Sequence, residues 1–223
     1  MRIHPTSVLI PLLAGLAACG STTAVSGTPD LIDVPGHHRL VVMDSPNWDF
    51  RWEERDTFHD TGLADCLLDA LDRKSSRFTL IPTRTFTRTA FPDLPDELVP
   101  TTPEYVRIAL TNTGVQDRVQ SLNVDYLIYV LGSTEMEHDW GGIMCGVGYG
   151  GGGCLGVAGL DKSSNISAVV VDVDSTQEMT NVNVTSSGDS WIAVLAVIPV
   201  WHDAPTKDAA CRALAEKLDE TLQ

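Results

Sequence analysis

The segment Val124–Leu131, with the sequence VDYLIYVL, is the strongest strand pattern in the chain. Nearly all of its side chains are apolar, and several are β-branched or aromatic, which favours a strand. A strand that is apolar at successive positions, instead of at every second one, is buried on both faces. We therefore expect a sheet that is covered by other structure on each side.

Strand and helix patterns alternate on both sides of this segment. The expected strands are His38–Met43, Arg77–Thr83, Ile166–Asp174 and Gln177–Ser186, and the expected helices begin at Thr61, Pro103 and Thr206. Each helix repeats apolar residues at helical spacing. Ser175-Thr176 is a turn that joins the last two strands as a hairpin. This order predicts an α/β fold, a single domain with a mixed β-sheet flanked by helices.

Helix boundaries carry more specific signals. Thr102 is a suitable N-cap, and Pro103 suits the first helical position because that position needs no amide hydrogen. The helix that follows is expected to break near residues 111–114. Asp60 or Thr61 is the expected cap of the first helix.

Four segments give weaker patterns. Phe86–Pro100 contains three prolines among acidic residues and is expected to be a surface loop. Glu135–Asp139 is expected to be a linker into a glycine-rich loop at Gly141–Gly159. Trp48–Trp52 is an edge strand or a loop. Trp191–Trp201 is apolar but contains Pro199, and we expect a buried strand that runs into a loop rather than a membrane insertion.

Composition limits the classes of function. The chain has 223 residues, of which 43% are hydrophobic and 20% charged, so it can bury the core of one ordinary domain. Fifteen Lys and Arg against 30 Asp and Glu give a formal charge of −15. Such an acidic chain is repelled by phosphates, so no nucleic acid partner is expected. No apolar run reaches the roughly 18 residues that a membrane-spanning helix needs.

The amino terminus has the features of an export signal. A single positive charge at Arg2 precedes the mostly apolar stretch Val8–Leu16, and residues 1–18 contain no acidic residue. Leu16-Ala17-Ala18-Cys19 resembles the lipobox of bacterial lipoproteins. The resemblance implies cleavage before Cys19 and acylation of that cysteine. The alternative is a plain secretory signal with an incidental cysteine.

The lipobox resemblance also implies an address. Gly20 and Ser21 follow the cysteine, and no aspartate is present of the kind that retains such lipoproteins at the inner membrane. The implied location is therefore the outer membrane, lipid-anchored on its periplasmic face. The expected organisation is a signal peptide at 1–18, a lipidated flexible tether at 19–36 and the α/β domain at 37–223.

Four cysteines remain after Cys19 is assigned to lipid. An even number in an exported protein predicts two disulfides. Three pairings are possible; Cys145 and Cys154 bracket a flexible glycine-rich stretch, and if they pair with each other Cys66 is left to pair with Cys211. Zinc binding is the alternative, but the close C-x-x-C spacing typical of zinc sites is missing. We expect no metal and no cofactor.

Three stretches resemble a group of bacterial envelope domains. Asn123–Ile128 is similar to a strand of the TolB amino-terminal domain that also occurs in CsgG and LpoB. Val169–Asp172 with Ser175–Gln177 resembles their next hairpin, and Ala210–Leu222 resembles their closing helix. The resemblance covers roughly residues 37–222. It implies a TolB-N/CsgG-like fold and a non-enzymatic domain that binds other envelope proteins, often as a homo-oligomer.

Motifs that suggest chemistry are weak. Gly146-x-Gly148-x-x-Gly151 matches a dinucleotide fingerprint, but neither a clear strand precedes it nor a helix follows it. The acidic residues of Glu135–Asp139, with His138, suit a divalent ion, although a solvated linker explains them as well. Ser190 and His202, with Asp203, suggest a serine hydrolase, but the elbow motif G-x-S-x-G is absent. No catalytic residue is assigned.

The leading hypothesis is a non-enzymatic adaptor, or an assembly or regulatory factor, of a cell-envelope complex. Its partners would be envelope proteins, with the membrane contacted through the lipid. Trp191, Trp201 and Tyr149 are the expected interface residues, because apolar residues beside flexible segments often form interfaces. Core packing and a disulfide-stapled loop are the alternatives. A subunit of an oligomeric secretion pore and a periplasmic serine hydrolase are the competing functions.

Overall fold

The structure is a computed structural model, and it describes residues 22–26, 36–45, 57–59, 62–149, 151–196 and 198–222. The expected signal peptide, Cys19 and Trp48–Trp52 lie outside these residues. The strands are β1 Thr22–Ser26, β2 His38–Asp44, β3 Thr57–His59, β4 Phe78–Leu80, β5 Tyr126–Gly148, β6 Gly151–Asp172, β7 Glu178–Ala196 and β8 Ile198–His202. The helices are α1 Leu63–Lys74, α2 Thr83–Ala90, α3 Pro103–Leu110, α4 Thr113–Ser121 and α5 Thr206–Thr221, with the 3₁₀ turn η1 at Asp96–Leu98.

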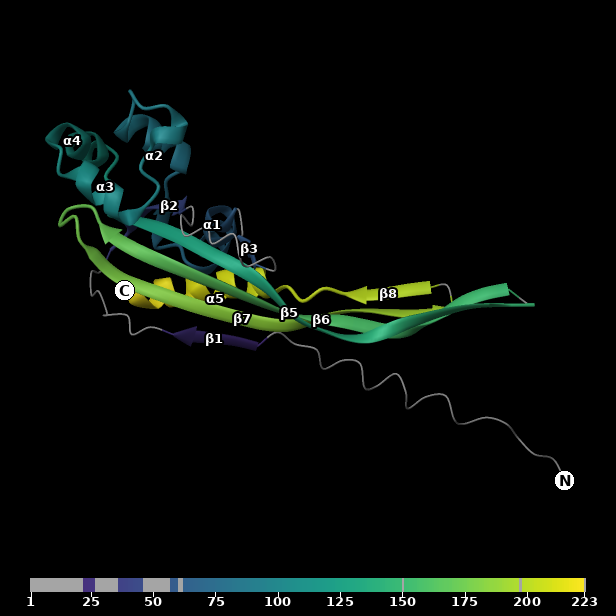
Figure 1. Ribbon diagram of the computed structural model, residues 1–223. Coiled ribbons are helices and arrows are strands. Elements are labelled where there is room, and N and C mark those ends of the chain that lie inside the picture. The colour runs from purple at the N-terminus through teal and green to yellow at the C-terminus, as the bar shows by residue number, and fades with distance from the viewer. Residues whose placement is uncertain are drawn as a thin grey trace.

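One mixed sheet joins all eight strands, and Figure 1 shows that it is much longer than the helical part of the molecule. Its main order is β1-β7-β6-β5-β2-β4, while β3 pairs with β5 and β8 pairs with β7. Strand β2 is parallel to β4 and to β5, and the other pairs are antiparallel. The expected mixed sheet is therefore confirmed.

Helices cover both faces of the sheet at one end. Ile128 and Val130 of β5 pack into a core with α1 and α5, and the intervening Leu127 and Tyr129 pack into a second core with α2, α3 and α4. Both sets of side chains are buried. This two-sided burial is the reason that Val124–Leu131 lacks polar alternation, as the sequence predicts.

Several expected elements are confirmed with shifted ends. Helix α3 has Pro103 in its first turn, and its Thr102 cap accepts a hydrogen bond from the Tyr105 amide at 3.4 Å. The expected break follows it, where Asn112 caps α4. The hairpin around Ser175-Thr176 is the antiparallel pair β6 and β7. No helix in the described ranges is long and apolar enough to cross a bilayer.

Four expectations are wrong in part or in full. Residues 86–100 are not a continuous loop, since α2 and η1 occupy part of them. Glu135–Asp139 is not a linker, and Gly141–Gly159 is not a loop, because β5 and β6 continue through both. Within the expected tether, residues 22–26 form β1 on the edge of β7.

The reason for the longer strands is pairing across the sheet. Every described glycine between Gly141 and Gly159 has a partner residue on the neighbouring strand. Glycine is unfavourable in an isolated strand, but the ladder fixes it here. Gly141 also requires glycine, because its φ is +81° and a Cβ would lie 2.2 Å from the Val157 carbonyl oxygen.

Candidate functional site

The sheet extends beyond the helices as an arm. We define the arm as residues 140–149 and 151–160 of β5, β6 and their turn, together with 190–196 of β7 and 198–202 of β8. The remaining described residues form the body. Figure 1 shows the arm leaving the body on one side, away from the five α-helices of the described residues.

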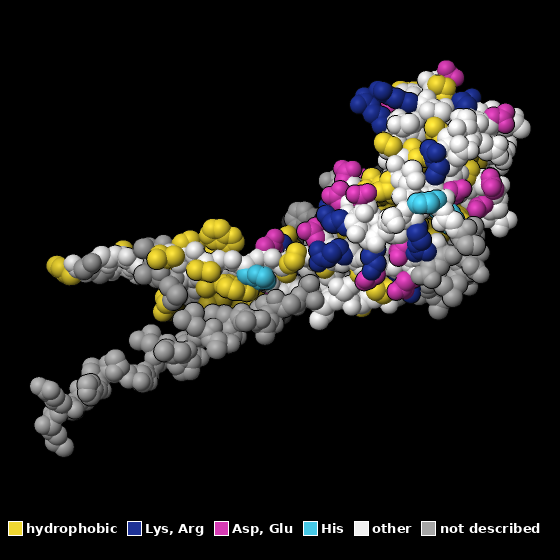
Figure 2. Space-filling view, turned by 180° about the vertical axis from the view of Figure 1, so that it is seen from behind, with side chains coloured by type: hydrophobic (Ala, Val, Ile, Leu, Met, Phe, Trp, Pro, Cys, Tyr) yellow, Lys and Arg dark blue, Asp and Glu magenta, His cyan; other side chains and the backbone are white. Residues whose placement is uncertain are grey.

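The arm is apolar and carries no charge from Trp140 to Leu160 or from Ser190 to Trp201. Figure 2 shows the charged side chains gathered over the body, while the described part of the arm shows hydrophobic side chains. Met144 is 82% exposed and Leu155 is 65% exposed. An apolar surface of this extent marks a site of interaction with protein or membrane.

Exposed apolar side chains occur along the whole arm. They are Trp140, Ile143, Met144, Val147, Tyr149, Leu155, Val157, Ile192, Ile198, Val200 and Trp201. Of the expected interface residues, Trp201 and Tyr149 are exposed and Trp191 is half-buried. The expectation of a buried strand at Trp191–Trp201 is wrong, because β7 and β8 form an exposed hairpin there.

Aromatic residues lie in one row at the base of the arm. Trp140, Gly159, Trp191 and His202 are direct partners on four successive strands. The Trp140 ring lies over Gly159, where a Cβ would be 2.3 Å from the ring. The rings of Trp191 and His202 have centroids 5.9 Å apart. The row combines apolar rings with polar ring nitrogens, as at a boundary between apolar and polar surroundings.

Charged residues begin immediately on the body side of this aromatic row. Asp161 pairs with Asp189 across β6 and β7, and Asp139 precedes Trp140 on β5. Lys162 contacts Asp203 beyond the end of β8. Like charges in direct cross-strand pairs are unfavourable, so the pair of Asp161 and Asp189 lowers the stability of the sheet at this border.

Ser190 has a structural role at the border. Its hydroxyl donates to Asp203 Oδ1 at 2.9 Å and accepts from the Ala204 amide at 3.0 Å. The cation of Lys162 and the Ser190 hydroxyl together hold the pKa of Asp203 below its usual value. Because the hydroxyl proton goes to a carboxylate and the His202 ring lies against Trp191, this geometry does not support a serine nucleophile with a histidine base.

The other chemical motifs are not assembled. Gly146, Gly148 and Gly151 flank the turn between β5 and β6, with no helix after them, so the dinucleotide interpretation is wrong. Among the residues whose placement is described, no group of three or more His, Cys, Asp and Glu side chains could hold a metal.

Both expected disulfides are present. Cys145 and Cys154 are direct partners near the tip of the arm, with Cα atoms 4.0 Å apart. Cys66 and Cys211 join α1 to α5, with Cα atoms 6.1 Å apart. The first bond pins the glycine-rich end of the β5–β6 hairpin, and the second ties together segments 145 residues apart in the body.

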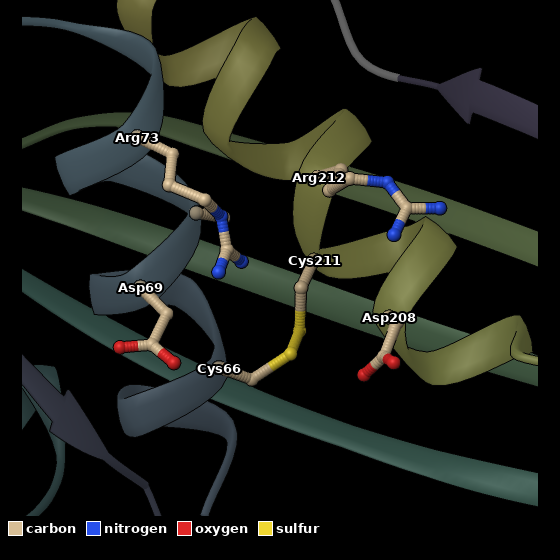
Figure 3. Close-up of a pocket in the computed structure, with 7 residues that line it drawn as sticks. Cys66, Asp69, Arg73, Asp208, Cys211 and Arg212 are labelled. Atoms are coloured by element: carbon tan, nitrogen blue, oxygen red, sulfur yellow. A yellow bond between two sulfur atoms is a disulfide. The ribbon is translucent and has the colours of Figure 1, made fainter.

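A shallow groove of about 430 Å³ surrounds the body disulfide. Figure 3 shows Asp69 and Arg73 of α1 on one side of the disulfide and Asp208 and Arg212 of α5 on the other. The groove is bounded by two acidic and two basic side chains, so its charges balance. It has no excess charge with which to select an ionic ligand.

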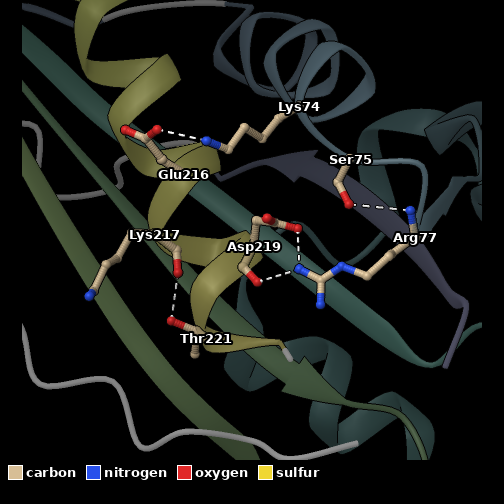
Figure 4. Close-up of polar contacts among 7 residues, drawn as sticks. All are labelled: Lys74, Ser75, Arg77, Glu216, Lys217, Asp219 and Thr221. Carbon is tan, nitrogen blue, oxygen red and sulfur yellow. Dashed lines mark hydrogen bonds and ion pairs between the residues drawn. The ribbon is translucent and has the colours of Figure 1, made fainter. Parts of the chain in front are cut away.

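A polar clamp holds α5 on the body near the same helices. Lys74 contacts Glu216 at 2.7 Å, and Arg77 donates to the Asp219 carbonyl oxygen at 2.8 Å as well as to its carboxylate. Figure 4 shows these contacts reaching from α1 and the start of β4 to the last turns of α5. They fix the body and leave the arm untouched.

Trp201 of β8 was an expected interface residue, but Trp140 was not, and the strand pairing of β8 was not predicted. The available signal was the absence of charged residues from both 140–160 and 190–201. Two uncharged segments of this length are unusual for loops that lie in water. Glycine content hid it, because glycine is typical of loops and concealed the strand pairing.

Comparisons with known proteins give no family assignment. No protein-family model and no curated protein matches the sequence. A PelC dodecamer from Paraburkholderia phytofirmans in space group P6 aligns with 91% of this chain and 99% of its own, at 11% identity and a TM-score of 0.38. A variant PelC dodecamer from the same organism in space group C2 aligns with 91% and 98%, at 11% identity and a TM-score of 0.40. At this level of likeness neither structure bears on the function of this chain.

Proposed function

We propose that this protein is a non-enzymatic, lipid-anchored subunit of a homo-oligomeric assembly at the periplasmic face of a bacterial outer membrane. The lipobox-like Leu16-Ala17-Ala18-Cys19 and the TolB-N/CsgG-like strand and hairpin motifs support the envelope address. The single observation that carries the proposal is the uncharged, exposed arm. The chain has a net charge of −15, but residues 140–160 and 190–201 carry none of these charges. A large exposed apolar surface of this kind marks a site of interaction.

The edges of the arm favour a second copy of the chain as its partner. In the described pairings, β5 beyond Glu135 bonds only to β6, and β8 bonds only to β7. An unpaired strand edge is a template for another strand. Strand β5 runs away from the body and β8 runs back toward it, so β5 of one copy can pair antiparallel with β8 of the next. Such a head-to-tail contact repeats around a ring.

The arm composition distinguishes this assembly from an open pore. A water-filled channel needs polar side chains on one face of its strands. Between His202 at the base of the arm and Tyr149 at its tip, the large side chains are apolar, and the disulfide uses the two cysteines. This distribution of side chains favours an assembly in which the arms of neighbouring copies pack against one another without an open channel. The charged body would then bind the other envelope proteins.

Photo-crosslinking in living cells tests the proposal. A photoreactive residue at Met144 on β5 or at Val200 on β8 is expected to give a ladder of multiples of this chain. The same residue at Ile108, an exposed apolar position on α3 of the body, is the matched control and should not give the ladder. An arm that crosslinks to nothing, or to other proteins alone, would contradict the homo-oligomer.

A further inference from the structure

We infer that the arm enters the hydrocarbon core of the membrane, to a depth set by the row of Trp140, Trp191 and His202. This inference rests on the proposed function, because it names the surroundings of the same arm. The lipid bilayer would surround the faces of the arm, while the strand edges pair with neighbouring copies of the chain.

The length of the arm fits that medium. Residues 140–148 of β5 are nine strand residues, and a tilted strand needs about 9–11 residues to cross the hydrocarbon core. The apolar band of outer-membrane strands is about 25 Å tall. Tyr149 then lies at the turn beyond the far end of this span, where an amphipathic ring is favourable at a membrane surface.

The base of the arm has the features of a membrane boundary. Three tryptophans belong to it, since Trp140 and Trp191 are in the row and Trp201 pairs with Ile192 one position further along. Tryptophan is enriched at the level of the lipid headgroups. Asp139, Asp161 and Asp189 come immediately after on the body side, and their carboxylates stop deeper entry. Figure 2 shows the same change from charged body to apolar arm.

The position of the expected lipid anchor, Cys19, is a separate argument for a membrane at the base of the arm. Strand β1 starts at Thr22, which pairs with Ser187, and it runs antiparallel to β7. The amino end of β1 is therefore its end nearer the arm. Cys19 is three residues earlier, a reach of at most about 10 Å. Ser187 is four residues from Trp191 on β7, about 13 Å, so the acyl chains of a lipidated Cys19 can cover the remaining distance to the aromatic row.

Open strand edges are costly in hydrocarbon, so the arm must enter with its edges paired. The antiparallel β5–β8 contact between copies satisfies this requirement over the length of β8. Insertion and self-association therefore support each other.

Tryptophan quenching by brominated lipids tests the inference. The full chain, purified from membranes, is reconstituted into vesicles of phosphatidylethanolamine and phosphatidylglycerol with bromine near the headgroup end or deep in the acyl chains. We expect stronger quenching by the shallow bromines in the wild-type chain. The variant carrying Trp140→Phe, Trp191→Phe and Trp201→Phe should lose that shallow quenching.

A pair of matched substitutions separates insertion from general effects. Leu155→Arg places a charge in the middle of the arm, and Leu98→Arg places it on the body at a leucine with nearly the same exposure, 66% against 65%. We expect Leu155→Arg to lower the inserted fraction at least about tenfold and Leu98→Arg to leave it unchanged. Unchanged circular dichroism in both variants controls for folding.

Two results would overturn the inference. One is wild-type fluorescence that neither bromine position quenches, and the other is equal quenching in the two arginine variants. If the crosslinked ladder in cells survives either result, the homo-oligomer stands and only the membrane location of its arms fails. If the ladder is missing while shallow quenching is present, the β5–β8 contact between copies fails, and only the position of the tryptophans at the headgroup level stands.

Discussion

Strands β5 and β6 belong to both the body and the arm, and the two regions differ in what lies against these strands. In the body, Leu127 and Ile128 are fully buried between two layers of helices. In the arm, Met144 and Leu155 on the same two strands are exposed. Body residues are apolar because they fill the protein's own core. Arm residues are apolar without a core of their own, which indicates that the matching surface is supplied from outside.

Removal of the two disulfides in turn should give the largest difference between body and arm in the free energy of unfolding. Replacing Cys66 and Cys211 with alanine opens a loop of 145 residues and should cost about 5 kcal/mol in the chain-entropy model. Replacing Cys145 and Cys154 opens a loop of nine and should cost about half as much. Urea unfolding of both double variants in detergent measures this. Equal losses would show that the arm disulfide supports the body.

Matched leucines sharpen the comparison at the level of packing. Leu127→Ala, in the second core, should lower the free energy of unfolding by about 2 to 5 kcal/mol because it leaves a cavity. Leu155→Ala, in the arm, should change it by less than about 0.5 kcal/mol because no protein atoms enclose the side chain. Denaturant midpoints of the detergent-solubilised variants provide the measurement. A loss of similar size at Leu155 would mean that the arm packs against its own chain.

The junction between the regions should respond weakly to pH. The pKa of Asp203 is lowered in the folded chain, so its stabilisation is present above the unfolded value of 3.8 and is lost as the pH falls below it. Asp203→Asn should remove this pH dependence. The effect should stay under about 1 kcal/mol, since the carboxylate is 70% exposed. Thermal unfolding of both proteins between pH 5 and 3 tests it, and parallel curves would exclude a role for the Lys162 contact.

The sequence predicted the body better than the arm. Val124–Leu131 showed a strand covered on both faces, because burial selects apolar residues at successive positions. The Thr102 N-cap and the position of Pro103 in the first turn of α3 were predicted correctly, because a helix start depends on a few neighbouring residues. The cysteine pairing followed from the even count and from the short separation of Cys145 and Cys154.

Helix α1 shows where local signals fail. The sequence offered Asp60 or Thr61 as its cap, yet the described N-cap is Gly62, and Asp44 of β2 accepts from the Ala64 amide at 2.7 Å. The acceptor lies 20 residues away in the chain. A partner from another strand can be found only once the fold has placed it.

The strands of the arm likewise depend on partners that are distant in the sequence. By itself the sequence determined the covered central strand, the alternation of strands with helices and an even cysteine count that predicts two disulfides, because burial and helix starts depend on residue type and spacing. Tertiary structure alone decided that the glycine-rich segment is strand, that Trp140 and Trp191 share one row, and that β1 lies on β7. These features depend on hydrogen bonds to distant strands, and the glycine pattern of a single segment does not encode them.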